Sequence, residues 1–197
     1  MILGKNSSCF QPLPMRSRIL NAKVKADKFV LKVAKLEDAE KIHGIMVTVY
    51  EELENKELYI CDELEFVKAN MEENGFCIVA YDCKGNIAGT FLIRYPGDAE
   101  DNLGRDLNFS VAEQKRVVHM ESAVVLPEYR GNHLQSKMLQ YGEAFIDKEK
   151  YQYLMATVSP DNPASYKSLE KNGYRHVLTK EKYQGLKRRI YCKKITF

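Results

Sequence analysis

The sequence contains few cysteines, and nothing in their placement predicts a structural role. There are five, Cys9, Cys61, Cys77, Cys83 and Cys192, and no two of them form a C-x-x-C pair. An odd and scattered set argues against a disulfide framework, and it lacks the spacing of a zinc site. We therefore expect reduced thiols, no metal and a cytoplasmic location.

Long apolar runs and a strong charge of one sign are also missing. No run approaches the roughly 18 apolar residues that a membrane-spanning helix requires, so we expect no membrane partner. The net charge is only +3, and no stripe of Lys and Arg interleaves with aromatic residues, so we expect no nucleic-acid partner. The basic residues near the C-terminus, among them Arg188 and Arg189, alternate with apolar ones as in a solvated strand.

What is present fits one globular domain. The chain has 197 residues, of which 45% are apolar and 29% are charged. Residues 1–26 contain no acid, but Pro12 and Pro14 would interrupt an amphipathic targeting helix. We therefore interpret residues 1–27 as an N-terminal extension and residues 28–197 as a single domain.

Apolar periodicity predicts an α/β fold with a mixed sheet. Four helices are expected: one with an apolar face from Ile42 to Leu53, one opened by a capping box of Asp62 and Glu65, and two over 132–148 and 163–172. Strands are expected at 29–34, 76–81, 87–95, 116–125, 153–158, 174–179 and 189–195. The central strand–helix–strand unit implies a parallel pair, and hairpins on both sides make the sheet mixed.

Residues 96–115 have no strong period and are rich in acids. A connection of this length inside a compact domain is usually functional or mobile. Two interpretations stay open. The segment is either an acidic flap that favours an amine-bearing substrate, or a solvated loop with no role.

The segment from Val117 to Tyr141 carries the clearest chemical signal. It predicts a strand, a short loop with Arg130 and Gly131, and the start of a helix. Free N–H groups and the helix dipole favour an anion there, Gly131 allows close approach of the backbone, and Arg130 adds positive charge. The sequence therefore predicts a pyrophosphate cradle, although neither a dinucleotide fingerprint nor a P-loop is present.

Two motifs resemble those of the GNAT superfamily of N-acyltransferases. The first is Val125-x-Pro127-x-x-Arg130-Gly131 followed by a helix. The second is an Asn-led helix, Asn162-Pro163-Ala164-Ser165, that ends in Leu169-Glu170-Lys171-Asn172-Gly173-Tyr174. Their order and separation, together with the order of the elements, extend the resemblance over nearly all of residues 28–197.

The resemblance implies a central mixed sheet flanked by helices, with a V-shaped opening between the parallel strands at 117–125 and 153–158. Acetyl-CoA would bind there as co-substrate. Its pantetheine arm would pair with the backbone of Val124 and Val125 as an extra strand does. Its pyrophosphate would meet the amides of Arg130, Gly131, Asn132, His133, Leu134, Gln135 and Ser136. Asn162 would lie beside the far end of the arm.

One departure from the family pattern concerns the phosphate loop. The common pattern is R-G-x-G-x-G/A, whereas His133 and Gln135 occupy the second and third small positions here. Every residue except proline supplies an N–H, so the backbone donors remain, but the bulk beside the phosphates increases. Either side chain could hydrogen-bond a phosphate directly or face solvent.

Acyl transfer to an amine requires a base that removes a proton. Side chains alternate along a strand, so residues 117, 119, 121, 123 and 125 are expected on one face, with His119 beside Glu121. We favour Glu121 as the base, with His119 as the alternative. Each could instead be a hydrogen-bonded residue at the edge of the sheet. By similarity, the Val125 N–H would stabilise the oxyanion.

Two residues are candidates for the general acid. Many relatives carry a Tyr seven residues after the helix's Asn, but Leu169 occupies that position. Ser165 and Tyr166 are the substitutes that share a helix with Asn162, and some relatives that act on ribosomal-protein N-termini have Ser in the position of Ser165. A thiolate can also leave unprotonated, and Tyr166 could be simple packing.

These features predict an acetyl-CoA-dependent N-acetyltransferase that transfers acetyl to a primary amine by direct attack. No cysteine lies in either motif, so a covalent enzyme intermediate is not expected. The alternatives are a non-catalytic acyl-CoA-binding or regulatory module and an unrelated α/β domain. The acceptor, whether a small molecule or a protein N-terminus, is not readable from the sequence. The acyl-chain length and the oligomeric state are equally open, a homodimer being one option.

Overall fold

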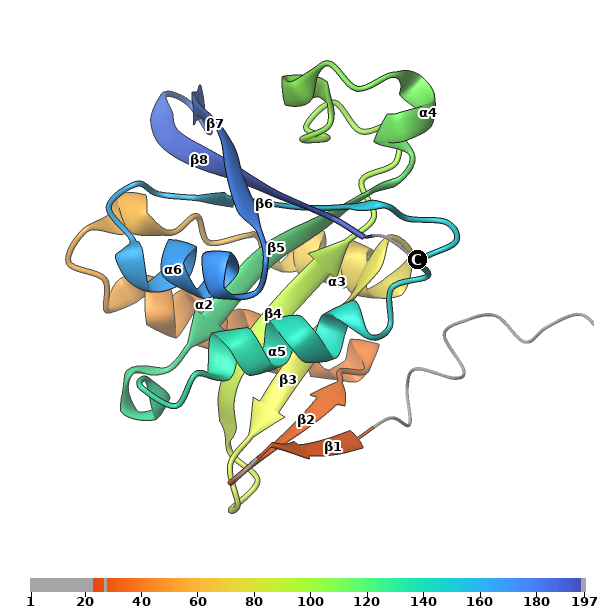
Figure 1. Ribbon diagram of the computed structural model, residues 1–197. Coiled ribbons are helices and arrows are strands. Elements are labelled where there is room, and N and C mark those ends of the chain that lie inside the picture. The colour runs from red at the N-terminus through yellow and green to blue at the C-terminus, as the bar shows by residue number, and fades with distance from the viewer. Residues whose placement is uncertain (1–22, 27, 196–197) are drawn as a thin grey trace, which may run out of the picture.

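The structure is a computed structural model that describes residues 23–26 and 28–195. In this part of the chain eight strands form one sheet, in the order β1-β2-β3-β4-β5-β6-β8-β7 (Figure 1). The strands are β1 (Lys23–Ala26), β2 (Phe29–Val33), β3 (Gly75–Tyr81), β4 (Ile87–Arg94), β5 (Val117–Val125), β6 (Tyr153–Val158), β7 (Arg175–Lys182) and β8 (Leu186–Lys194). The α-helices are α2 (Ala39–Glu51), α3 (Leu64–Glu72), α4 (Val111–Gln114), α5 (Leu134–Glu143) and α6 (Pro163–Lys171). Short 3₁₀ turns are η1 (Leu36–Asp38), η2 (Lys56–Leu58), η3 (Arg105–Leu107) and η4 (Pro127–Tyr129).

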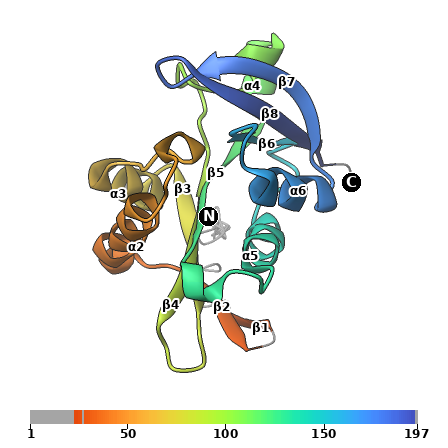
Figure 2. The same ribbon diagram turned by 90° about the vertical axis from the view of Figure 1, so that its left-hand side faces the viewer.

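The helices cover the two faces of the sheet (Figure 2). On one face, α2 and α3 bury apolar residues spaced by three or four, such as Ile42 and Met46, against β3, β4 and β5. On the other face, α5 and α6 pack residues such as Met138 and Leu169 into a second core cluster. None of the helices in the described part of the chain has both the length and the apolar character needed to cross a membrane.

The expected mixed sheet with one splayed parallel pair is confirmed. Strands β5 and β6 run parallel and every other neighbouring pair is antiparallel. The parallel pairing covers only Val117 to His119 against Tyr153 to Met155. Beyond His119 and Met155 the two strands continue without pairing, so their inner backbone edges are open to a ligand.

The expected alternation along β5 is wrong. The register between β4 and β5 shifts between Phe91 and Ile93, which face Ala123 and Met120. Three residues of β5 therefore span two of β4, as at a β-bulge, and the alternation inverts there. Met120 and Ala123 contact the same core cluster although an odd number of positions separates them. Residues 117, 119 and 121 share one face, but 123 and 125 lie on the other.

Several boundaries also differ from expectation. Helix α5 begins at Leu134 instead of residue 132, because Gly131 (φ +78°) and His133 (φ +56°) have left-handed backbones. The Asp62 capping box is wrong, since Glu63 is the N-cap residue of α3 and makes no side-chain cap. The sheet begins at Lys23, inside the segment that we interpreted as an extension. The rest of that segment, residues 1–22 and 27, lies outside the described residues.

Candidate active site

A cavity of about 810 Å³ occupies the opening between β5 and β6. Its lining comes from these strands, from the connection between α2 and α3, and from the N-terminal parts of α5 and α6. Most of the predicted site residues line it: His119, Glu121, Val124, Val125, Arg130, Gly131, His133, Leu134, Gln135, Ser136, Asn162 and Ser165. Asn132 and Tyr166 are not part of the lining.

The loop before α5 presents free backbone donors. The N–H groups of residues 131–136 have no hydrogen-bond partner among the described residues. His133 is the N-cap residue, but its side chain is exposed and makes no cap. Asn132 fixes the turn instead, because its Nδ2 donates to Tyr129 O (2.8 Å) and Arg130 O (3.2 Å). The predicted anion cradle is therefore geometrically present from Gly131 onward, but the Arg130 amide is not part of it, because this N–H donates to Pro127 O (3.1 Å).

The side chains that follow join α5 to α6. Gln135 Nε2 donates to Ser165 Oγ (3.0 Å), and Ser136 Oγ lies 3.0 Å from Ser168 Oγ. Gln135 is thus already engaged with a neighbouring helix, and it is not directed at the cradle. Asn162 caps α6 as predicted, with its Oδ1 accepting from Ser165 N (3.1 Å).

The backbone of β5 also offers a donor to the opening. Leu126 N donates to Ala88 O (3.0 Å), so Leu126 and Ala88 of β4 form a hydrogen-bonded pair. Hydrogen-bonded and non-hydrogen-bonded pairs alternate along an antiparallel ladder. Val125, which faces Gly89, therefore directs its N–H away from β4 and toward the space where β6 has diverged. A Cβ at Gly89 would lie 2.6 Å from Val124 O, so glycine permits this close approach of the strands.

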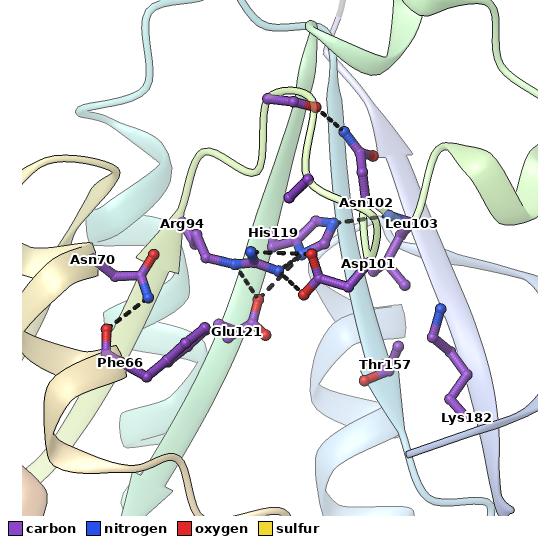
Figure 3. Close-up of polar contacts among 12 residues, drawn as sticks. Phe66, Asn70, Arg94, Asp101, Asn102, Leu103, His119, Glu121, Thr157 and Lys182 are labelled. Carbon is purple, nitrogen blue, oxygen red and sulfur yellow. Dashed lines mark hydrogen bonds and ion pairs between the residues drawn. The ribbon is translucent and has the colours of Figure 1, made fainter. Parts of the chain in front are cut away.

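Two residues of the cavity lining, His119 and Glu121, belong to a cluster of four charged or titratable side chains, called here the Glu121 cluster: Arg94, Asp101, His119 and Glu121 (Figure 3). Arg94 is 6% exposed and forms a bidentate pair with Asp101, at 2.5 and 3.2 Å. Its Nε lies 3.5 Å from Glu121 Oε2, and His119 Nδ1 lies 3.2 Å from the same oxygen. Two neighbours therefore hold the Glu121 carboxylate.

The protonation of His119 follows from its partners. The Leu103 N–H donates to Nε2 (3.0 Å), so Nε2 must carry a lone pair. The ring N–H of the neutral imidazole is then on Nδ1 and points at Glu121, because the nearby Arg94 guanidinium cannot accept a hydrogen bond. His119 has no lone pair left for a substrate in this arrangement. This favours Glu121 as the base and His119 as the residue that positions it.

The same contacts set the charge of Glu121. Burial alone would raise the pKa of this carboxyl, but the hydrogen bond from His119 and the charge of Arg94 outweigh burial and lower its pKa below the usual range. Glu121 is therefore ionised at neutral pH and can accept a proton. Its side chain is 17% exposed, so part of it reaches the cavity.

The acidic segment 96–115 does not form a free acidic flap. Most of its acids have partners within the protein: Asp98 with Lys115, Asp101 with Arg94, Asp106 with Lys180 and Lys182, and Glu113 with Ser110. The buried Asn102 organises the segment through bonds to Gly97 O and Gln114 O. The segment contributes two groups to the site: Asp101, which pairs with Arg94, and the Leu103 N–H, which donates to His119.

The two candidate acids differ in position. Ser165 lines the cavity, and because its oxygen accepts from Gln135 its own hydrogen stays available for donation. Tyr166 packs against the core, with the Arg189 guanidinium 4.6 Å from its ring centre. The placement of Tyr166 fits packing and gives no support to a role as an acid.

A second acid in the cavity was missed by the sequence analysis. Asp62 accepts a short hydrogen bond from Ser122 Oγ, and burial raises the pKa of this carboxyl to about 6. Arg94 and Arg188, also buried, were missed as well. The sequence offers a signal for Arg94 alone, as a charged residue on an otherwise apolar strand. It offers no such signal for Asp62 or Arg188. Within the described residues, no group of three or more His, Cys, Asp or Glu side chains is placed to hold a metal.

Solved structures of known proteins share this fold. An acetyltransferase of the GNAT family from Listeria monocytogenes 4b F2365 matches with a TM-score of 0.64 at 17% identity, over 88% of this chain and 100% of that one. A ribosomal-protein-S5-alanine acetyltransferase from Vibrio fischeri matches with a TM-score of 0.60 at 16% identity, over 88% and 97%. An aminoglycoside acetyltransferase in complex with coenzyme A and kanamycin matches with a TM-score of 0.62 at 13% identity, over 84% and 94%.

Sequence comparison identifies the family. No curated protein sequence matches the chain. The model of the acetyltransferase (GNAT) family, however, matches residues 39–174, which include both sequence motifs, the Glu121 cluster and the free amides before α5. The chain therefore belongs to the GNAT acetyltransferase family.

Proposed function

We propose that the protein transfers an acetyl group from acetyl-CoA to a primary amine by direct attack, with Glu121 as the general base. The observation that carries the proposal is that one cavity joins the free amides of residues 131–136 to an ionised carboxylate on β5. The aminoglycoside acetyltransferase of the same fold was solved with coenzyme A, and this supports a coenzyme site at the corresponding opening.

In this mechanism the pyrophosphate binds the amides at the start of α5, with Arg130 beside it. The amine nitrogen attacks the thioester carbon, and its proton passes to Glu121 directly or through water. The Val125 N–H stabilises the oxyanion of the tetrahedral intermediate. The C–S bond then breaks, and the Ser165 hydroxyl donates a hydrogen bond to the departing thiolate.

Replacement of the base tests the proposal. We expect Glu121→Gln to lower kcat about 10²–10⁴-fold against any accepted amine, because a neutral amide cannot take the proton. Acetyl-CoA should still raise the melting temperature, since Glu121 lies away from the cradle. The exposed Glu149→Gln is the matched control and should behave as wild type.

Other results would separate the alternatives. Unchanged turnover and an unchanged pH profile in Glu121→Gln would remove Glu121 as the base. Stabilisation of the wild type by acetyl-CoA without turnover of any amine would favour a non-catalytic acyl-CoA-binding module. No binding of CoA or acetyl-CoA would contradict the proposed function altogether.

A further inference from the structure

Arg188 is not a solvated strand residue, as its basic neighbourhood led us to expect. Its side chain is buried, with 4% exposure, and it lines the cavity. Its place in β8 is beside Ile190, whose side chain contacts Val117 and Met155. Arg188 therefore lies on the sheet face that also carries His119 and Glu121, opposite the face that α5 and α6 cover.

The Arg188 guanidinium makes its direct contacts with neutral groups, although the charge of Glu57 acts on it at longer range. Nη2 donates to Glu57 O (2.7 Å) and Nη1 to Lys187 O (3.0 Å), both backbone carbonyls. Among the described residues it forms no ion pair with a carboxylate. The Tyr183 ring, 5.7 Å from Cζ, gives a cation–π contact but no negative charge. A guanidinium has five N–H groups, so several remain for another acceptor.

A buried, unpaired charge is costly, and a neutral amide could make hydrogen bonds to the same two carbonyls. The cation is therefore best explained by an anion that binds in the cavity. The free amides before α5 form a separate anion site, built on the opposite face of the sheet. Arg188 contacts Glu57, in the connection between α2 and α3, and the ring of Tyr183, and Glu121 lines the same cavity.

The cavity lining carries charges of both signs. Glu121 and Asp62 are acids that attract an amine, and Arg188 attracts an anion. Glu121, Tyr183 and Arg188 all line this one cavity, so groups of both signs can act on one small molecule bound in it. A phosphate dianion would be repelled by the two acids more strongly than a carboxylate. One planar guanidinium also matches one carboxylate well.

We infer that the acceptor is a small amine that also carries a carboxylate, as an amino acid does, and that Arg188 binds this carboxylate while Glu121 faces the amine. The inference rests on the proposed function and specifies its substrate class.

The first test compares amino acids with their carboxamides on the wild-type protein. Each pair keeps the carbon skeleton and the amino group, and the acid alone carries a negative charge. A panel of α-, β- and γ-amino acids is needed because the skeleton length is open. We expect kcat/KM, measured by release of CoA thiol, to be about tenfold or more higher for the accepted acid than for its amide. Equal values for acid and amide would overturn the inference, as would a preference for phosphoethanolamine or for peptides with an acidic first residue.

The second test changes the guanidinium. Arg188→Gln should raise KM for the acid by about tenfold, leave the amide unchanged and bring the acid-to-amide ratio close to one. Arg189→Gln is the matched control, since Arg189 is the next residue and stacks on Tyr166 outside the cavity, and it should keep the wild-type ratio. An unchanged ratio in Arg188→Gln would contradict the inference. If this variant does not fold, the wild-type comparison of acid and amide decides alone.

Failure of the inference is distinguishable from failure of the proposed function. If acetyl-CoA binds and only amines without a carboxylate, such as polyamines, are acetylated, the substrate class is wrong and the transferase proposal stands. If acetyl-CoA neither binds nor is consumed with any acceptor, the proposed function itself fails.

Discussion

Two carboxylates in one cavity have opposite electrostatic environments. Glu121 has Arg94 and His119 as neighbours, and they keep its pKa low despite burial. Burial dominates at Asp62, which has the Ser122 hydroxyl as its direct partner, and its pKa rises to about 6. A carboxyl group is therefore ionised at position 121 and titrates near neutrality at position 62. This difference depends only on neighbours, and it keeps Glu121 ionised at neutral pH.

The raised pKa of Asp62 should make the free energy of unfolding depend on pH. An Asp carboxyl has an ordinary value of 3.8, so between about pH 4 and 6 the folded state binds more protons than the unfolded state. Stability from this residue is present at low pH and is lost as the pH rises through 6. Asp62→Asn removes the effect.

We expect the free energy of unfolding of Asp62→Asn, relative to wild type, to be about 1–3 kcal/mol more favourable at pH 7.5 than at pH 4. Urea denaturation at both pH values measures it. The same variant-to-wild-type difference at the two values would show that the carboxyl is not perturbed by burial.

At the scale of elements, the start of α5 decides how the cradle is formed. His133 has a left-handed backbone at the position where the family pattern has a small residue. A Cβ in that conformation costs about 1–2 kcal/mol, and glycine avoids the cost. The His133 Cβ therefore strains the backbone, but the side chain does not fill the cradle, because the imidazole is exposed.

The pair His133→Gly and His133→Ala separates the backbone effect from the side-chain effect. Both variants remove the imidazole, but only glycine relieves the left-handed backbone. We expect the glycine variant to be about 1 kcal/mol more stable than the alanine variant in urea.

Calorimetry on the same pair tests the side chain. Since the imidazole is exposed, we expect acetyl-CoA to bind to both variants about as tightly as to wild type. A large loss of affinity in both would mean that His133 contacts a phosphate.

At the scale of the whole molecule, segment 95–116 and the β7–β8 hairpin close the same end of the sheet (Figure 1). Asp106 in η3 joins them through ion pairs with Lys180 (2.7 Å) and Lys182. Leu103, from the same segment, packs with Ile190 of β8 and supplies the N–H that fixes His119. The hairpin that carries Arg188 and the segment that positions Glu121 are thus held together.

Asp106→Asn should loosen this connection. Burial alone would raise the pKa of Asp106, but the two lysines lower it, so its contribution to stability is present above pH 3.8 and is lost as the pH falls. At pH 7 we expect the variant to lose about 1–3 kcal/mol, because two ammonium groups lose a largely buried partner.

The control is Asp98→Asn, whose ion pair with Lys115 is exposed and longer, at 3.6 Å, and should contribute less than about 0.5 kcal/mol. Urea denaturation compares the two variants. Equal losses would show that the Asp106 contacts do not join the segment to the hairpin.

Local information in the sequence was sufficient for the framework. Apolar spacing identified α2 and α3, and Asn162, Pro163 and Gly173 bounded α6 to within one residue. The strand, Arg-Gly loop and helix that hold the free amides are also contiguous, so their arrangement depends on residues close together in the chain. The family resemblance rested on these segments, and the match over residues 39–174 confirms it.

Only the tertiary structure decided the chemistry of the side chains in the cavity. Arg94 meets His119 across 25 positions, Asp62 meets Ser122 across 60, and Arg188 meets Glu57 across 131. The bulge that turns Ala123 away from the face of Glu121 likewise depends on the register with β4. Charge, burial and pKa are set by groups that meet only when the chain has folded, so no window of the sequence contains them.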